Sequence, residues 1–348
     1  MNKLKFLPSV LLLTALAAAS CAVEPNEDIT LSYDRVMTAW INVNHPGMTP
    51  YGTYGAYVLD KQTGDGPAVT DSAYVWVHYT KKALDQSILS GNLQSVDEQL
   101  GLYAASNYYG SDIWRVDQGY LPEGLEEVLK TLRSGGSASI ALPYSSSYHD
   151  YSVYTAFSGT SESDNYLFDL TVDTVMTDIY AYQEQVMRDW FQTHYDTADT
   201  LSEGLYFKLL TEKTDDGQDD DAAEDGKENE SATDTISDGA AVQVRYIGRL
   251  LNGQVFDTNI EDTAKFYRLW KNGATYNALS IEYYKDDSQF AEHNSVVTGF
   301  GKAIRQMNYG DEAVTLFESR LGYGESGSGK SIPEYAPLIF WLYIEPKN

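Results

Sequence analysis

An internal repeat is the sequence feature that most constrains how this chain can fold. Three pairs of segments correspond in the same order: Gly55–Leu89 with Gly204–Phe256, Gly124–Asp150 with Gly299–Glu325, and Asn165–Val172 with Pro337–Ile344. Apolar residues alternate in YVWVHY (74–79) and in VQVRY (242–246), which indicates strands, and the middle segments each begin with one amphipathic helical stretch. The 348 residues therefore read as two copies of one unit in which strands flank a short helix.

The repeat sets the expected limits of the domains along the chain. These limits are a signal peptide at 1–20, a lipidated tether and N-terminal helix at 21–54, a first copy at 55–177, a connecting helix at 178–203, and a second copy at 204–348. In the connecting helix, an apolar stripe is predicted at Ile179, Tyr182, Val186 and Trp190, with Phe191 as an optional further member. The stripe fits packing on a neighbouring domain or pairing with a second copy of the chain, and the sequence leaves both open.

The N-terminus has the pattern of an export signal. Residues 1–5 are basic, residues 6–19 are apolar, and small residues precede Cys21, which is the chain's single cysteine. This arrangement is typical of a bacterial lipoprotein, although Ala18 stands where the usual cleavage motif has Leu. We expect an exported protein that is anchored through a lipid on Cys21, with the outer membrane as the expected location. An ordinary signal peptide with a chance cysteine is the alternative.

The charge of the chain is strongly acidic and unevenly distributed. The net charge of −27 argues against a nucleic-acid partner, because binding phosphates requires a basic face. Residues 214–238 alone carry 11 acids and one lysine, a net charge of 1 − 11 = −10. This stretch lies within an acidic insertion at 213–238, which we expect to be disordered because it has little apolar surface to bury.

The second copy contains the strings that indicate a function. They are VQVRYIGRLLNGQVFDTN (242–259), VVTGF (296–300), LGYG (321–324) and SIPEYAPLIFWLYI (331–344). Their aromatic and aliphatic residues with one embedded acid are the inventory of an apolar pocket with a few polar groups. In this order and spacing the strings resemble the FKBP-type peptidyl-prolyl cis/trans isomerases. The resemblance implies tandem α+β domains, each a curved antiparallel sheet around one short helix.

The resemblance also implies a slot for a proline ring and assigns its residues. The apolar ones would be Tyr246, Phe256 and Phe340 in the walls, Phe300 in the floor and Ile332 at the rim. Val297 would offer its backbone N–H to a substrate carbonyl, and Tyr323 would offer its hydroxyl to the amide oxygen. Asp257 would hydrogen-bond within the pocket and supply a local field. Family members usually have a further aromatic wall soon after the acid; here an insertion of roughly twenty residues intervenes, and Leu279 or Ile281 is the candidate replacement.

The first copy lacks several of these residues. Tyr79, Tyr148 and Phe168 persist, but Ile88-Leu89-Ser90 stands at the position of VFD. Pro122 occupies the position of the backbone donor, and proline has no N–H to donate. We therefore expect the first domain to be a non-catalytic scaffold or a peptide-binding module.

One motif in the second copy invites a different reading. GESGSGKS (324–331) matches the spacing of a phosphate-binding loop, but Pro333 and Pro337 follow, and the next segment reads as a strand. The five histidines show no metal-ligand spacing. We therefore expect no nucleotide, no metal and no cofactor. The expected function is proline isomerisation in polypeptide clients during the folding of exported proteins. The alternative is a chaperone or binding lipoprotein that keeps the fold without turnover.

Overall fold

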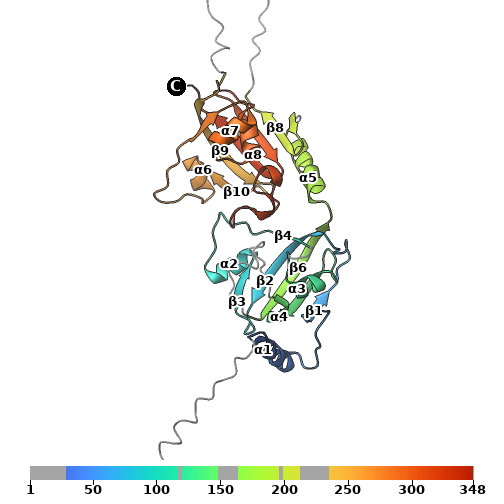
Figure 1. Cartoon of the computed structure of the whole chain (residues 1–348). Helices are drawn as coiled ribbons and strands as arrows, with labels where there is room; N and C mark the ends of the chain where they lie inside the picture. The colour runs from blue at the N-terminus through green and yellow to red at the C-terminus, as the bar shows by residue number, and fades with distance from the viewer. Residues whose placement is uncertain (1–28, 117–119, 148–163, 196–198, 212–234, 348) are drawn as a thin grey trace, which may run out of the picture.

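The computed structural model describes residues 29–116, 120–147, 164–195, 199–211 and 235–347 of the chain. It forms two sheet-containing lobes, with α1 (Ile29–Asn44) at one end and the C-terminus at the other (Figure 1). Cys21, Tyr148 and most of the acidic insertion lie outside the described residues. The expected disorder is wrong for residues 235–238, because Ile236 is 2% exposed and packs in the core of the second domain. Among the helices of the described ranges, none combines the length and apolar character that a membrane crossing needs.

The first sheet is antiparallel and has the order β1-β5-β6-β2-β3, with β4 also paired to β2. Its strands are β1 (Tyr57–Gln62), β2 (Tyr74–Lys82), β3 (Ile88–Gly91), β4 (Asp112–Arg115), β5 (Ser137–Leu142) and β6 (Tyr166–Met176). Three short helices accompany it: α2 (Gln94–Leu100), α3 (Glu123–Leu129) and α4 (Tyr144–Ser147). The strict alternation of buried and half-buried residues along β2 follows from the two-residue period of a strand.

The second sheet is also antiparallel and has the order β10-β9-β13-β12-β8-β7, with β11 also paired to β9. Its strands are β7 (Asp199–Ser202), β8 (Leu205–Leu209), β9 (Ala240–Leu250), β10 (Val255–Thr258), β11 (Leu279–Tyr283), β12 (Glu312–Phe317) and β13 (Leu338–Ile344). Its helices are α6 (Glu261–Phe266), α7 (Asp287–His293) and α8 (Thr298–Ile304), with single 3₁₀ turns at Ser319–Leu321 and Gly324–Ser326.

The two sheets have one topology. When β7 is set aside, each strand of the second sheet has a counterpart in the first: β8 with β1, β9 with β2, β10 with β3, β11 with β4, β12 with β5 and β13 with β6. The helix that precedes the fifth of these strands, α3 or α8, has the same place in both copies. The expected class, tandem α+β domains with antiparallel sheets, is therefore confirmed.

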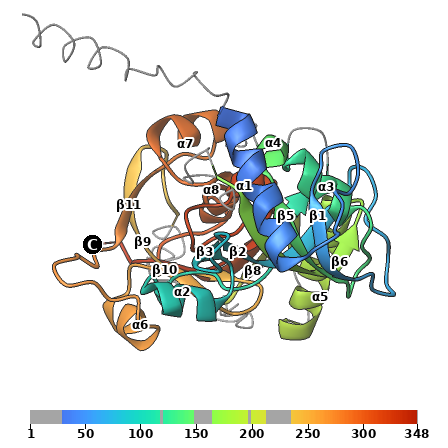
Figure 2. The same ribbon diagram turned by 90° about the horizontal axis from the view of Figure 1, so that it is seen from below.

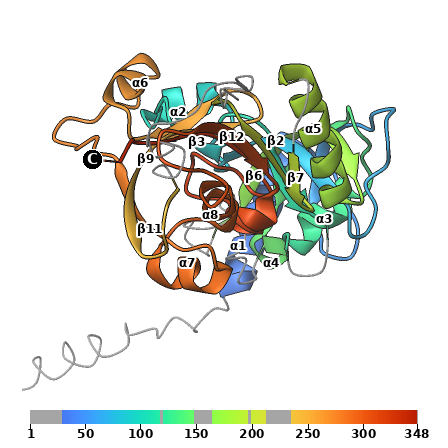
Figure 3. The same ribbon diagram turned by 90° about the horizontal axis from the view of Figure 1, so that it is seen from above.

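Each core lies between the sheet and its principal helix. In the second domain β9, β11 and β12 surround α8 (Figure 3), and the buried Phe300, Ala303 and Ile304 of this helix face the sheet. The approach is close because α8 contains Gly299, where a Cβ would lie 2.3 Å from the Phe317 ring. Each domain has additional short helices beside this one, so the expectation of a single helix per copy holds only for the helix in the core.

The outer faces of the two sheets carry one long helix each. Met37 and Ile41 of α1 pack on Tyr57, Ala141 and Leu167 of the first sheet, at the β1–β5 end (Figure 2). On the second sheet, α5 (Ile179–His194) lies beside β8 (Figure 1).

The buried face of α5 differs from the predicted stripe. Its fully buried residues are Ile179, Gln183, Met187 and Phe191. Tyr182 is 38% exposed. Gln183 is a polar residue in this buried face. Its amide is satisfied there, because it donates to the Ser319 hydroxyl (3.0 Å) and accepts from the Ser319 N–H (2.8 Å). The helix thus packs on the second domain of its own chain.

Candidate active site

Four aromatic rings form a slot on the inner face of the second sheet. Phe340 of β13 is central: its ring centroid lies 5.6 Å from Phe256, 5.2 Å from Phe300 and 6.1 Å from Tyr246, and all three contacts are edge-to-face. Phe300 and Tyr246 also meet at 5.9 Å and 89°. Aromatic pairs prefer such arrangements, with ring centroids about 4.5–7 Å apart. The partly buried Tyr246 and Phe256 give this cluster an apolar surface for a ligand.

A β-bulge turns Phe256 toward this slot. The register between β10 and β9 shifts between Val255 and Asp257, so Phe256 is the extra residue. Its ring lies against Gly248 of β9, where a Cβ would be 2.6 Å from Phe256 Cζ and 2.9 Å from Phe340 Cε1. Only glycine leaves room for both rings, so Gly248 is a requirement of the slot that sequence reasoning missed.

The polar side of the slot is built from two tyrosines and one acid. Tyr246 donates its hydroxyl to Asp257 Oδ2 at 2.8 Å, and the Thr258 N–H donates to Asp257 Oδ1 at 2.9 Å. Burial raises the pKa of Tyr246, and the charge and hydrogen bond of Asp257 raise it further. Burial and the charge of Asp257 also raise the pKa of Tyr323. Both hydroxyls therefore stay protonated at neutral pH and can donate hydrogen bonds.

The remaining predicted residues close the same cluster. Val297 is the N-cap of α8, so its N–H precedes the helical hydrogen-bond ladder. Ile332 is 5% exposed and packs with Phe300 and Phe340. The structure thus brings together all eight residues expected from the sequence: Tyr246, Phe256, Asp257, Val297, Phe300, Tyr323, Ile332 and Phe340.

Asn259 supports the site and was not predicted. Its side chain accepts from the Tyr246 N–H (2.9 Å) and donates to the Val244 carbonyl (2.8 Å), which fixes the chain just beyond the bulge. Two predicted candidates for the missing wall, Leu279 and Ile281, lie on β11 opposite Val244 and Val242 and pack in the same apolar cluster.

The first domain holds matching positions with different residues. Asn92 makes the same two bonds there, accepting from the Tyr79 N–H (2.9 Å) and donating to the Val77 carbonyl (2.7 Å). Asp257 precedes Asn259 by two residues, and Ser90 precedes Asn92 by two residues, so Ser90 occupies the position of the acid. The β2–β3 register shifts at Leu89, which therefore occupies the position of the bulge residue. Pro122 is the N-cap of α3, as Val297 is of α8. The predicted correspondence of the two copies therefore matches the structure at each of these points.

A loop of the first domain contacts the edges of the second-domain slot. The Tyr108 N–H donates to the Lys330 carbonyl (2.6 Å), and Gln254 Nε2 donates to the Asn107 carbonyl (2.9 Å). Lys330 and Gln254 each lie two residues from a slot residue, Ile332 and Phe256 respectively. The first domain is therefore in a position to steady the rim.

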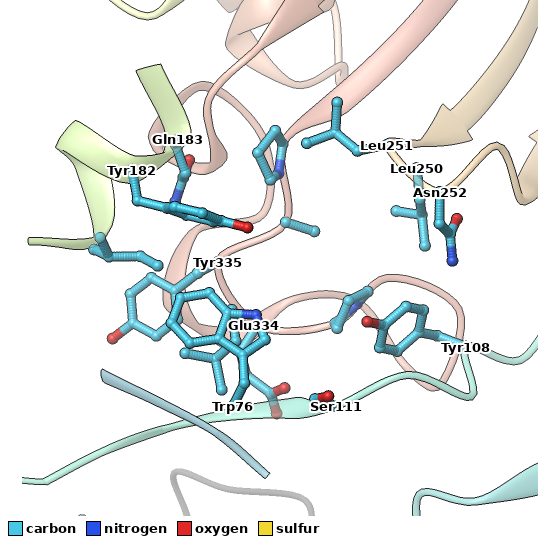
Figure 4. Close-up of a pocket in the computed structure, with 15 residues that line it drawn as sticks. Trp76, Tyr108, Ser111, Tyr182, Gln183, Leu250, Leu251, Asn252, Glu334 and Tyr335 are labelled. Carbon is cyan, nitrogen blue, oxygen red and sulfur yellow. The ribbon is translucent and has the colours of Figure 1, made fainter. Parts of the chain in front are cut away.

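Beside this contact, a second hollow of about 180 Å³ lies between the domains. Trp76 and Tyr182 meet edge-to-face in its wall at 5.3 Å, and Glu334 and Tyr335 line it from the second domain (Figure 4). Nearby, burial raises the pKa of Asp112 to about 7, and the charge of Glu334 adds to the effect. Two acids from different domains thus share one weakly hydrated region.

Phosphate-binding loops and metal sites each require a geometry that the described residues do not provide. Residues 324–331 form a single 3₁₀ turn and a bridge between Ser328 and Ile332, without the helix whose N-terminus a phosphate-binding loop requires. Lys330 pairs with Asp97 of the first domain (3.2 Å). Within the described residues, no group of three or more His, Cys, Asp or Glu side chains could hold a metal ion.

Comparison with known proteins relates the second domain to one family. Residues 232–344 match the family model described as FKBP-type peptidyl-prolyl cis-trans isomerase. A probable FKBP-type peptidyl-prolyl cis-trans isomerase of Haemophilus influenzae is 30% identical over 118 residues, which cover 33% of this chain and 39% of that protein. A probable FKBP-type 25 kDa isomerase of Pseudomonas aeruginosa is 33% identical over 104 residues, covering 29% of this chain and 34% of that protein. The matches thus span less than half of either relative.

Among solved structures, the three FKBP domains of wheat FKBP73 cover 84% of this chain and 94% of their own, at 15% identity and a TM-score of 0.27. The second domain thus combines an aromatic cluster on an antiparallel sheet with one acid that is hydrogen-bonded to a tyrosine of the cluster. Residues 232–344 of the chain, which form most of the second domain, are thus similar to the FKBP-type peptidyl-prolyl cis-trans isomerases.

Proposed function

We propose that the second domain catalyses cis/trans isomerisation of X–Pro bonds in polypeptides. The observation that carries the proposal is the ring of Tyr246, Phe256, Phe300 and Phe340 with Asp257 bonded to Tyr246 at its edge. Rotation about the X–Pro bond is opposed by amide resonance, with a barrier of about 18–20 kcal/mol. A slot that binds the twisted amide more tightly than the planar one lowers this barrier.

The residues of the slot act by binding and not by proton transfer. The apolar rings hold the proline and remove water from its amide, and a desolvated carbonyl contributes less to resonance. The Tyr323 hydroxyl, which stays protonated, donates to the carbonyl oxygen of the twisted amide, and the Val297 N–H holds the next carbonyl. Asp257 keeps Tyr246 oriented and places negative charge beside the rotating bond.

We further propose that the chain is exported and lipid-anchored at Cys21, and that its clients are exported proteins containing proline. The signal-like N-terminus supports both statements. Expression of the full chain and of Cys21→Ala in a Gram-negative host tests the anchor. We expect the wild type in the membrane fraction and the variant in the soluble one. Wild type found free in the periplasm would exclude the anchor.

Magnetisation-exchange NMR on a proline peptide tests the catalytic proposal. The intact chain should accelerate cis/trans exchange, and Asp257→Asn should lower the rate. Asp262→Asn is the matched control, because Asp262 is nearby, is 97% exposed and forms no part of the slot. If the wild type binds the peptide but leaves its exchange rate unchanged, the non-catalytic binding protein is the correct alternative.

A further inference from the structure

Lys81 lies in the first domain at the position of Gly248 in the second. Lys81 on β2 and Gly248 on β9 both occupy buried positions on the inner face of their sheet. Lys81 pairs with Phe168 of β6, as Gly248 pairs with Phe340 of β13. The residue that leaves the second slot open is thus replaced by one of the longest side chains.

The Lys81 side chain is folded into the domain. It is 2% exposed, although a lysine on a surface sheet normally reaches solvent. Its Nζ lies 3.7 Å from the Tyr166 ring centroid and 5.8 Å from that of Phe168, so the amine is held by aromatic faces. The bulge residue Leu89, by contrast, is 40% exposed. The Lys81 amine thus lies beside Phe168, the counterpart of the slot residue Phe340.

We propose that Lys81 fills the slot of the first domain, and that the residue at this position decides which of the two slots accepts a prolyl ring. The inference rests on the proposed function of the second domain. An occupant within the chain acts at an effective concentration of the order of millimolar or higher. A proline peptide that binds weakly cannot compete with it. The Lys81 side chain thus takes the place of a ligand in the slot of the first domain.

The second domain shows the reciprocal restriction. Any Cβ at Gly248 meets the Phe256 and Phe340 rings at 2.6 and 2.9 Å, closer than real contacts allow. Gly248→Ala must therefore displace the wall of the slot. We expect KM for a proline peptide to rise at least about 10-fold. The Asn259 bonds lie on the far side of Tyr246, so the sheet register should be kept.

Titration of a proline tetrapeptide into 15N-labelled full chain tests the inference by NMR. The second slot is first disabled with Phe256→Ala and Asp257→Asn. In that background Lys81→Gly should gain saturable shifts at the Val77 and Tyr79 amides, and adding Leu89→Phe should strengthen them. Lys81→Met, which refills the volume without charge, should gain none. Shifts in Lys81→Met, or their absence in folded Lys81→Gly/Leu89→Phe, would overturn the inference.

A second measurement does not depend on isomerase activity. Burial lowers the pKa of Lys81 to about 8, against the opposing charge of Asp164. Tyr166 is the other titratable group at the amine, and Lys82 and Asp169 form an ion pair beside it. NMR of the lysine Cε signals should show one amine titrating near pH 8. If all lysines titrate near 10.5, Lys81 does not fill the slot; if the wild type binds no peptide, the proposed function fails instead.

Discussion

The two domains share one strand order, one core helix position and one asparagine clamp, yet they differ at the positions that form the aromatic slot of the second domain. Among the slot positions the differences are Gly248 against Lys81, Phe256 against Leu89, Asp257 against Ser90, Val297 against Pro122, and Phe300 against Leu125. These differences lie at matching positions, and both domains have a register shift at the bulge residue. Sheet topology and slot chemistry can therefore vary independently in this protein.

The largest effect should come from truncating the bulge residue of each domain. Phe256→Ala should lower kcat/KM for a proline peptide about 100-fold, because it removes a wall and lets water reach the amide. Leu89→Ala is the matched change in the first domain and should leave the rate unchanged. A protease-free assay of proline isomerisation measures kcat/KM for both variants, and circular dichroism shows whether each variant is folded. Equal losses would mean that both domains contribute to turnover.

Removing the acid should have a smaller effect. Asp257→Asn should reduce kcat/KM about 10-fold, because the acid is exposed and its field is partly screened by water. Ser90→Asp, the reciprocal change in the first domain, should not create activity while Lys81 is present. Exchange NMR on each variant measures this. A gain of activity in Ser90→Asp would show that the acid, and not the open slot, limits the first domain.

The interface between the domains should respond to pH. The folded-state pKa of Asp112, about 7, lies above its ordinary value of 3.8, so the folded state holds a proton that the unfolded state has lost. This contribution to stability is present below pH 4 and disappears as pH rises through 7. Asp112→Asn should therefore raise Tm above that of the wild type by about 2–4 °C at pH 8.

Thermal melts from pH 4 to pH 8 provide the measurement for this change. The gain from Asp112→Asn should grow as the pH rises. Asp262→Asn, whose side chain is 97% exposed, should show no such trend. A gain for Asp112→Asn that is the same at every pH would contradict the raised pKa.

The smallest effect is expected for the acidic insertion of the second domain. Deleting residues 216–233 should change Tm by about 1 °C or less, because like charges with little apolar surface add no packing. Differential scanning calorimetry measures the change. A loss of several degrees would show that the segment packs against the domain.

The parts of this protein that follow from sequence are those with local signals. The slot residues could be predicted because VFD, VTGF and GYG, in this order and spacing, resemble the motifs of a known family, and the strands and helix start beside them have local signals. The position of Pro122 follows in the same way from the amphipathic helix behind it. These patterns need only neighbours along the chain.

Other features depend on tertiary contacts that no local pattern reports. Alternation along β2 places Lys81 on the inner face, but only the structure shows that its amine is buried on the Tyr166 ring and does not reach solvent. Gln183 interrupts the apolar stripe of α5 because its amide is satisfied by Ser319, a residue 136 positions away. The role of Gly248 requires knowing that Phe256 and Phe340 meet above it. In each case burial is decided by a distant partner.

Mapping peptide binding on the intact wild-type chain tests the central claim most directly. A proline tetrapeptide is titrated into 15N-labelled protein, and amide shifts are followed in both domains at once. We predict saturable shifts at Tyr246, Val297 and Ile332, with none at the matching Tyr79. Shifts at Tyr79 with a comparable Kd would contradict the account, because they would show that the first slot is open despite Lys81.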